Sequence, residues 1–297
     1  MTNTIWAHDV AEPEGPVWAP DGSLYIVEMG AHRSCVSRLT PDGKESRSIF
    51  KTVRRPNGLA IDGEGRLWIA EAYEGAIICI DSGGRELKRI PGDGSGRFLW
   101  PNDFVFAPNG LLYMTDSGIR EADFIDASGI RADYLDARYD GKVWEIDPAA
   151  GRVLRQLDRG LKFANGIALG PDGLLYANES LTGEVYRYDL AKDRPERQPF
   201  ANVLRADLPP AFRGPDGMKF GADGRIYCTV FGQGDVTVID PDGTISGRIA
   251  TLGARPTNIA FAPSGAFAVV TEVADGTVER MPATCAGAPL HYPAFRI

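Results

Sequence analysis

A short signal recurs six times along the chain: a turn that ends in glycine, one further residue, and then two or three residues that favour β-strands. The six turn glycines are Gly22, Gly65, Gly110, Gly173, Gly224 and Gly265. Apolar residues alternate with others on both sides of these turns, a pattern that predicts two antiparallel strands joined by each turn. Successive turn glycines are 43, 45, 63, 51 and 41 residues apart, which is close to the length of a β-propeller blade.

The repeats predict an all-β fold, a six-bladed β-propeller with four-stranded blades that forms a single domain over residues 1–297. Runs such as Val143–Ile146 and Val185–Tyr188 supply a third strand. The 35 glycines and 21 prolines provide many turns and disfavour a helix-rich fold. A pair of β-sandwiches would not explain one signal that recurs along the whole chain. Because Thr4–His8 precedes the first unit, we expect it to pair with the last blade and close the ring.

The 63-residue spacing between Gly110 and Gly173 is the longest of the five. The additional residues lie around 117–140, a charged stretch with interspersed isoleucine and tyrosine. An insertion of this kind is either an ordinary surface loop or a lid, because extra loops on one face of a repeat protein often shape its binding site. Both interpretations stay open at this point.

An acid or an amide stands eight residues before each of the first five turn glycines, and another stands seven before the sixth. These residues are Glu14, Asn57, Asn102, Asn165, Asp216 and Asn258. Residues at the same distance in sequence from the turn glycine occupy equivalent positions in every blade. We expect this position to be the beginning of the innermost strand. The sequence therefore predicts a ring of six oxygen-bearing side chains at one mouth of the central channel.

Turn formation is the alternative explanation for this ring. Asn57, Asn165 and Asp216 each precede a glycine, and Asn-Gly and Asp-Gly are strong turn signals. However, Glu14 and Asn102 occupy the same offset without forming a favoured turn pair. The complete set therefore favours a site over a series of turns.

Carboxylates and amide oxygens without histidine or cysteine indicate a site for a hard divalent cation. Ca²⁺ is the first choice, Mg²⁺ or Mn²⁺ would also fit, and Zn²⁺ is less favoured because it prefers nitrogen and sulfur ligands. We expect Glu14 and Asp216 to supply the charges and Asn102 and Asn165 to add carbonyl oxygens. A cation in this position can polarise a carbonyl or phosphoryl oxygen and lower the pKa of water, which predicts a metal-assisted hydrolase.

Two acids are candidates for the catalytic chemistry. Asp216 could act both as a ligand and as the general base for water, and Asp103 is a second catalytic candidate beside Asn102. Asp116 ends a strand, and it is either a solvated strand terminus or a further acid of the site. The chain contains no GxSxG, HExxH or GxxxxGK[ST] motif, which disfavours other common hydrolytic arrangements.

The remaining signals concern partners and location. A net charge of −8 without a basic stripe argues against a nucleic-acid partner. Met1–Val10 has neither a cationic leader nor a long apolar run, and no stretch approaches the roughly 20 apolar residues of a membrane span, so we expect a cytoplasmic protein without a membrane partner. The four separated cysteines predict buried, reduced thiols.

Five segments resemble the senescence-marker-protein (regucalcin), gluconolactonase and luciferin-regenerating-enzyme family: Glu14-Gly-Pro-Val-Trp, Arg55-Pro-Asn-Gly-Leu-Ala, Trp100-Pro-Asn-Asp-Phe-Val, Phe163-Ala-Asn-Gly-Ile-Ala-Leu and Gly214-Pro-Asp-Gly-Met. The resemblance implies a six-bladed propeller with a divalent metal in its channel that hydrolyses lactones, commonly aldonolactones. It matches the metal ligands of the family to Glu14, Asn165 and Asp216. It also matches Asn57 and Asn102 to family positions that contact the substrate or form an additional part of the metal shell.

Two positions depart from the family pattern. Trp100 stands where regucalcin-like members have an arginine, and Arg120 stands at a lid position often held by glutamate. Both positions contact the sugar in the family, so the resemblance implies that Trp100 and Arg120 bind the substrate. An aromatic face in place of the arginine favours a less polar or aromatic lactone or ester.

Two alternatives to a lactonase stay open from the sequence. The first is hydrolysis of phosphotriesters or other esters at the same calcium site. The second is a propeller without catalytic activity, either a calcium-binding regulator or a scaffold for protein interactions. A scaffold needs no converging carboxylates, so the ring of acids and amides favours an enzyme with a small-molecule substrate.

Overall fold

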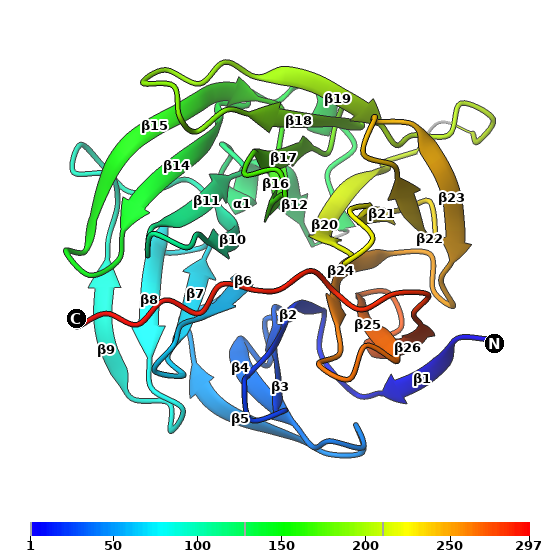
Figure 1. Ribbon diagram of the computed structural model, residues 1–297, viewed down its shortest axis with the longest axis horizontal. Coiled ribbons are helices and arrows are strands. Elements are labelled where there is room, and N and C mark those ends of the chain that lie inside the picture. The colour runs from blue at the N-terminus through cyan, green and yellow to red at the C-terminus, as the bar shows by residue number, and fades with distance from the viewer. Residues whose placement is uncertain (1, 128, 210) are drawn as a thin grey trace.

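The computed structural model describes residues 2–127, 129–209 and 211–297. Its strands form six four-stranded antiparallel sheets that are arranged as blades in a ring (Figure 1). The predicted six-bladed β-propeller with four-stranded blades is confirmed. The described residues include no helix that is long and apolar enough to cross a membrane.

Each blade is numbered by its innermost strand in chain order, and its strands follow from the centre of the ring outward. Blades 1 to 3 contain β2 (Pro13–Trp18), β3 (Leu24–Glu28), β4 (Cys35–Leu39) and β5 (Ser46–Lys51); β6 (Pro56–Ile61), β7 (Leu67–Glu71), β8 (Ala76–Ile80) and β9 (Glu86–Ile90); and β10 (Pro101–Phe106), β11 (Leu112–Asp116), β14 (Gly141–Asp147) and β15 (Arg152–Leu161). Blades 4 to 6 contain β16 (Ala164–Leu169), β17 (Leu175–Glu179), β18 (Glu184–Tyr188) and β19 (Gln198–Asn202); β20 (Gly214–Phe220), β21 (Ile226–Phe231), β22 (Asp235–Ile239) and β23 (Ile245–Ala250); and β24 (Pro256–Phe261), β25 (Phe267–Glu272), β26 (Thr277–Pro282) and β1 (Thr4–Ala7).

The six turn glycines connect the first strand of each blade to the second. All six have a φ angle between 70° and 85°, a region that side chains with a Cβ rarely adopt. This backbone requirement explains why the same signal recurs in every blade. The runs that were expected to form third strands lie in β14 and β18, as predicted.

The ring closes where the N-terminal strand joins the last blade. Strand β1 pairs antiparallel with β26, with Thr4 opposite Arg280 and Ile5 opposite Glu279. This pairing confirms the predicted closure. Trp6 reinforces it, because its ring lies 5.8 Å from that of Trp18 in blade 1.

The hydrophobic core consists of layers between neighbouring blades. Trp68 of blade 2 is buried and packs edge-on against Phe106 of blade 3, with 6.3 Å between the ring centroids. Tyr176 and Phe220 make the corresponding contact between blades 4 and 5 at 5.1 Å. The four cysteines are free thiols, as predicted, and all except the half-buried Cys285 are buried.

The insertion around residues 117–140 connects β11 to β14. It contains α1 (Glu121–Phe124), the short strands β12 (Ile125–Asp126) and β13 (Gly129–Ile130), and a 3₁₀ turn, η1 (Tyr134–Asp136). Phe124 anchors the insertion, because its ring lies 4.6 Å from Phe163 of the segment that leads into blade 4. The insertion therefore packs against the body of the propeller.

The segment that follows β26 crosses one face of the ring (Figure 1, red). Ala288 donates a backbone hydrogen bond to Phe220 of blade 5 at 2.8 Å, and Gly63 of blade 2 donates one to Pro293 at 2.9 Å. The Tyr292 hydroxyl also donates to the Trp18 carbonyl of blade 1 at 3.3 Å. The C-terminal segment thus connects three blades, a feature that the repeats did not predict.

We expect Trp6→Ala to lower the free energy of unfolding by about 2 kcal/mol, because it removes a large half-buried ring from the seam between the first and last blades. Ile5→Ala is the matched control, since Ile5 lies on the same strand but its side chain is 47% exposed. Chemical denaturation of both variants measures the difference. Equal losses of stability would show that Trp6 does not hold the seam.

Candidate functional site

The predicted ring residues lie near the beginnings of the six innermost strands. Their strands are β2 for Glu14, β6 for Asn57, β10 for Asn102, β16 for Asn165, β20 for Asp216 and β24 for Asn258. Each of these strands shifts register against its neighbour near the ring residue, as expected where a β-bulge re-aims a side chain. The ring residues belong to strands, so the interpretation of these positions as turns was wrong.

The glycines that follow three of the ring residues have a different cause. A Cβ at Gly58 would overlap the Asn102 carbonyl of the next blade, and one at Gly166 would overlap the Asp216 carbonyl. A Cβ at Gly217 would overlap the side chain of Asn258. These glycines therefore allow neighbouring innermost strands to approach each other closely.

A cavity of about 440 Å³ opens at this end of the ring. Trp100 lines it, as do five of the six ring residues. These five are Glu14, Asn57, Asn102, Asn165 and Asp216. Residues of the insertion, among them Phe124, Ile125 and Ile130, form another part of the wall. The structure thus brings the predicted metal ligands together beside the insertion.

Arg120 does not take the predicted position. It is exposed at the N-cap of α1 and is not among the residues that line the cavity. Arg55 and Arg255 contribute the guanidinium groups of the cavity wall. Neither arginine was predicted as a site residue from the sequence, although Arg55 begins one of the five family-like segments.

Three oxygen atoms of the ring are buried without a hydrogen-bond partner among the described residues. They are Glu14 Oε2, Asn102 Oδ1 and Asn165 Oδ1. A buried acceptor left unpaired typically costs about 1–3 kcal/mol, so such groups are rare in native proteins. Their convergence on one cavity indicates a place for a cation or another electron-pair acceptor.

Two serines determine which way the amides face. Asn102 Nδ2 donates to Ser117 Oγ at 3.0 Å, and Asn165 Nδ2 donates to Ser180 Oγ at 3.1 Å. Each serine donates its own proton to a backbone carbonyl of the next blade, at 2.9 and 2.7 Å. Because a hydroxyl has one proton, each serine must accept from the amide nitrogen, which leaves the amide oxygen free.

Sequence reasoning missed Ser117 and Ser180, although a signal was present. Each serine follows its asparagine by 15 residues and its turn glycine by seven. Ala72 stands at the equivalent position of blade 2, so Asn57 lacks this partner. The repeated spacing could have revealed the pair.

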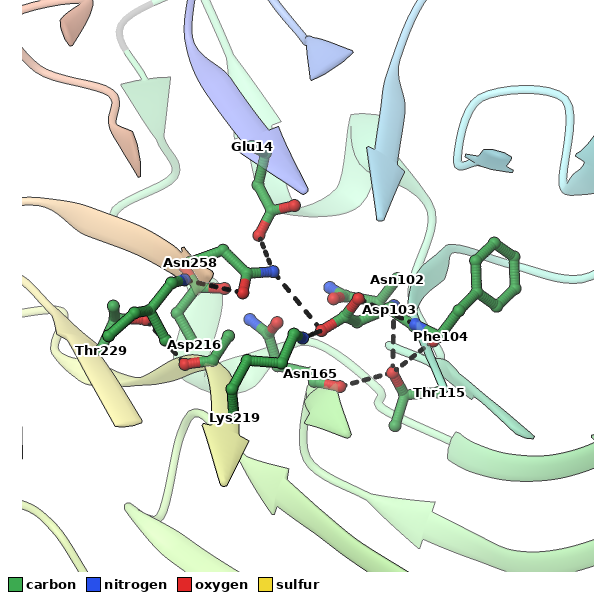
Figure 2. Close-up of polar contacts among 12 residues, drawn as sticks. Glu14, Asn102, Asp103, Phe104, Thr115, Asn165, Asp216, Lys219, Thr229 and Asn258 are labelled. Carbon is green, nitrogen blue, oxygen red and sulfur yellow. Dashed lines mark hydrogen bonds and ion pairs between the residues drawn. The ribbon is translucent and has the colours of Figure 1, made fainter. Parts of the chain in front are cut away.

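Polar side chains that do not themselves line the cavity contact Glu14 and one another (Figure 2). Asn258 Nδ2 donates to Glu14 Oε1 at 2.9 Å and to Asp103 Oδ2 at 3.4 Å, while Lys219 Nζ lies 3.4 Å from the same Asp103 oxygen. Asn258 Oδ1 accepts from the backbone N–H of Ile259. Asn258 therefore orients Glu14 and does not offer its oxygen to the cavity, and Asp103 lies outside the cavity wall.

A second set of buried acids follows the first ring at the ends of the second strands: Glu28, Glu71, Asp116, Glu179 and Glu272. Each accepts a hydrogen bond from the backbone N–H 17 residues before it. Asp116, for example, accepts from Leu99 and Trp100, both at 2.9 Å. Asp116 is therefore neither a solvated strand terminus nor a site acid, because it holds the segment that leads into the ring.

The two acids of the ring, Glu14 and Asp216, both have raised pKa values. Burial, followed by the charges of Asp103 and Asp216, raises the pKa of Glu14 well above 4.5. Burial is also the main cause that raises the pKa of Asp216 well above 3.8, and a hydrogen bond from Asn165 opposes it. The carboxylates of Glu14, Asp103 and Asp216 repel one another, and a bound cation would relieve this repulsion.

The donor set fits a hard divalent cation. The described residues contain no cluster of three or more histidine, cysteine, aspartate or glutamate side chains arranged for a metal. The candidate set instead combines two carboxylates, Glu14 and Asp216, with the free amide oxygens of Asn102 and Asn165. Oxygen ligands of this kind suit Ca²⁺ better than Zn²⁺.

The fold and the cavity define a six-bladed β-propeller with a ring of acid and amide side chains at one end of its axis. The chain belongs to the SMP-30/Gluconolactonase/LRE-like family, which it matches over residues 12–271. The resemblance seen in the five short motifs is thereby confirmed.

Curated relatives in this family include lactone-hydrolysing enzymes. The chain is 27% identical over 283 residues to a gluconolactonase of Zymomonas mobilis, covering 88% of this chain and 76% of that protein. It is 26% identical over 249 residues to lactonase drp35 of Staphylococcus epidermidis, covering 81% and 70%. The solved structure of a calcium-binding protein, regucalcin, from Agrobacterium tumefaciens superposes with a TM-score of 0.75 at 18% identity, covering 100% of this chain and 98% of that chain.

We expect Gly166→Ala to cost about 2 kcal/mol of unfolding free energy, because the added methyl group must displace the backbone of the next blade. Gly96→Ala is the matched control, since a Cβ there has no heavy atom within 4 Å. Denaturation midpoints of the two variants make the comparison. A Gly166→Ala variant as stable as the control would refute the close-approach explanation.

Proposed function

We propose that this protein is a divalent-cation-dependent hydrolase that opens the ring of a lactone. The observation that carries the proposal is the set of three buried, partnerless oxygens, Glu14 Oε2, Asn102 Oδ1 and Asn165 Oδ1, on one cavity. Membership in a family with gluconolactonase and lactonase relatives supports the choice of substrate class. Ca²⁺ is the proposed cation, with Mg²⁺, Mn²⁺ or Zn²⁺ as alternatives.

Glu14, Asn165 and Asp216 would hold the cation, with Asn102 completing the set. When bound, the cation would polarise the lactone carbonyl and lower the pKa of a nearby water. Ser117 and Ser180 would keep the two amide oxygens directed at it. Asn258 would do the same for the Glu14 carboxylate.

Asp216 is proposed as the general base, because it lines the cavity in which the lactone would bind. It would take a proton from the water that attacks the carbonyl carbon. The bond between that carbon and the ring oxygen then breaks, and the proton passes to the leaving oxygen. Asp103, a catalytic candidate from the sequence, lies outside the cavity wall beside Lys219, so its proposed contribution is to the charge around Glu14.

Asn57 and Trp100 are the proposed substrate contacts among the predicted residues, since both line the cavity. The Asn57 amide nitrogen donates a long hydrogen bond of 3.5 Å to the Asn102 carbonyl, and a bound lactone would compete for this weak contact. Arg120 is left out of the proposal because it is exposed outside the cavity. The insertion is proposed to act as a cover over this end of the channel.

Ring opening of a panel of lactones, followed with a pH indicator before and after chelation, tests the proposal. We expect activity to fall at least a hundredfold on chelation and to return with Ca²⁺, Mg²⁺ or Mn²⁺. Asp216→Asn should abolish turnover, and Glu14→Gln should weaken Ca²⁺ binding at least tenfold by calorimetry. Glu12→Gln is the matched control, because Glu12 lies on the same cavity but is exposed.

Three outcomes would contradict the proposal. Full activity in a sample that elemental analysis shows to be metal-free would remove the role of the cation. Hydrolysis of phosphotriesters without hydrolysis of any lactone would favour the alternative esterase. Tight Ca²⁺ binding without any turnover would indicate a binding protein.

Ser180→Ala should lower Ca²⁺ affinity about tenfold, because residues that orient metal ligands typically contribute 10- to 100-fold to affinity. Without the hydroxyl, the Asn165 amide can rotate and place its nitrogen toward the cation. Calorimetry measures the affinity, and thermal unfolding in chelator checks that the fold is intact. Ser95→Ala, a change at an exposed serine, is the control. Unchanged affinity in Ser180→Ala would rule out the orienting role.

A further inference from the structure

Five aromatic side chains form a continuous wall along the cavity: Trp100, Phe163, Phe124, Phe212 and Phe231. Each ring contacts the next in this order, with centroid separations of 5.4, 4.6, 5.5 and 5.5 Å. Trp100, Phe163 and Phe212 lie in the segments that lead into blades 3, 4 and 5, Phe124 lies in the insertion, and Phe231 lies in β21 of blade 5. We name this surface the aromatic wall.

From the aromatic wall we propose that the substrate is a lactone that carries an apolar substituent, such as an aryl or alkyl group, and few hydroxyl groups. This inference rests on the proposed function and specifies its substrate class. The lactone ring would face the acids and amides, and the substituent would lie against the aromatic wall. Apolar contacts with aromatic rings favour such a group, because its burial removes apolar surface from water.

The two arginines beside the aromatic wall are partly engaged, and Arg55 keeps a buried Nε without a hydrogen-bond partner among the described residues. Arg55 pairs with Glu12 at 3.4 Å, and its guanidinium lies 5.6 Å from the centre of the Trp100 ring. Arg255 lies 5.9 Å from the centre of the Phe231 ring. Both arginines therefore extend the wall with planar groups that can cover an aromatic substituent.

The hydroxyl groups of the cavity are also engaged. Ser180 Oγ donates to a backbone carbonyl at 2.7 Å, and Thr257 Oγ1 donates to the Pro13 carbonyl at 2.9 Å. A polyol lactone needs a partner for each hydroxyl that it buries, and a hydroxyl buried without one is disfavoured. Beyond the ring residues and the two arginines, the cavity thus offers a polyol few partners.

The insertion strengthens the apolar character of the cavity. Phe124, Ile125 and Ile130 line the cavity, whereas Glu121 pairs with Arg54 at 3.3 Å. Arg131 and Asp133 pair with each other at 2.9 Å; Arg131 is half-buried and Asp133 is exposed. Of the charged residues of the insertion, Glu121, Arg131 and Asp133 thus form ion pairs, and Phe124, Ile125 and Ile130 line the cavity together with Asp126.

The test compares three δ-lactones: phenyl-substituted δ-valerolactone, unsubstituted δ-valerolactone and glucono-δ-lactone. We expect kcat/KM for the phenyl compound to exceed that for glucono-δ-lactone at least tenfold. Phe231→Ser should lower the ratio of the phenyl to the unsubstituted compound about tenfold. Phe200→Ser is the matched control, because Phe200 is half-buried, contacts Tyr176 at 5.0 Å and lies outside the cavity.

A second measurement does not depend on turnover. The phenyl-substituted δ-lactam keeps the shape of the substrate but resists hydrolysis, and calorimetry with chelated protein measures its binding. We expect it to bind at least tenfold more tightly than the unsubstituted δ-lactam, and Phe231→Ser should remove this difference. Thermal unfolding of the variant establishes that the fold is retained.

The outcomes separate this inference from the proposed function. Preference for glucono-δ-lactone, with equal binding of the two lactams, would overturn the inference and leave the lactonase standing. Failure to open any lactone, with tight binding of the phenyl lactam, would overturn the lactonase and support the assignment of the cavity to apolar ligands. Failure of both measurements would overturn both.

Discussion

The close approach of six innermost strands around one axis is the constraint on which the rest of the structure depends. Adjacent strands come so near that residues such as Gly58, Gly166 and Gly217 have no room for a Cβ. The same crowding places a local irregularity in each innermost strand and directs one side chain per blade toward the axis. A site built in this way draws each of its members from a separate sheet, so its geometry is as rigid as the ring itself.

The number and order of the blades could be predicted from the sequence because they rest on a local backbone requirement. Each turn glycine has a positive φ angle, and this need appears in the sequence wherever the turn recurs. The positions of Glu14, Asn102, Asn165 and Asp216 followed from the same register. Such features depend on the local sequence of one blade, so they can be predicted without knowing which residues of other blades they contact.

The features that could not be predicted from the sequence depend on contacts between blades. Ser117 orients Asn102 through a hydroxyl whose own proton goes to a carbonyl 47 residues further along the chain. The aromatic wall combines rings as distant as Trp100 and Phe231. Arg120 was expected at the cavity because the family resemblance matched it to a lid position that contacts the substrate, whereas the structure exposes it at the N-cap of α1. Such contacts follow from the ring as a whole and not from any one repeat.

Two sets of buried acids show how similar residues acquire different roles. Asp116 and Glu272 have backbone N–H groups as partners, so their charge is neutralised by the fold and is available to nothing else. Glu14 has one oxygen without any partner among the described residues. A count of conspicuous acids would treat these residues alike, and only the accounting of hydrogen bonds separates a structural carboxylate from a site carboxylate.

The C-terminal segment connects blades 5, 1 and 2 across the face of the ring. Residues Ala286 to Tyr292 line a cavity of about 260 Å³ there, together with the far ends of the innermost strands. The segment links these blades directly across the face of the ring, in addition to the contacts between neighbouring blades around it. The two faces of the ring therefore differ in what covers them. The C-terminal segment crosses one face, and the insertion lies at the other.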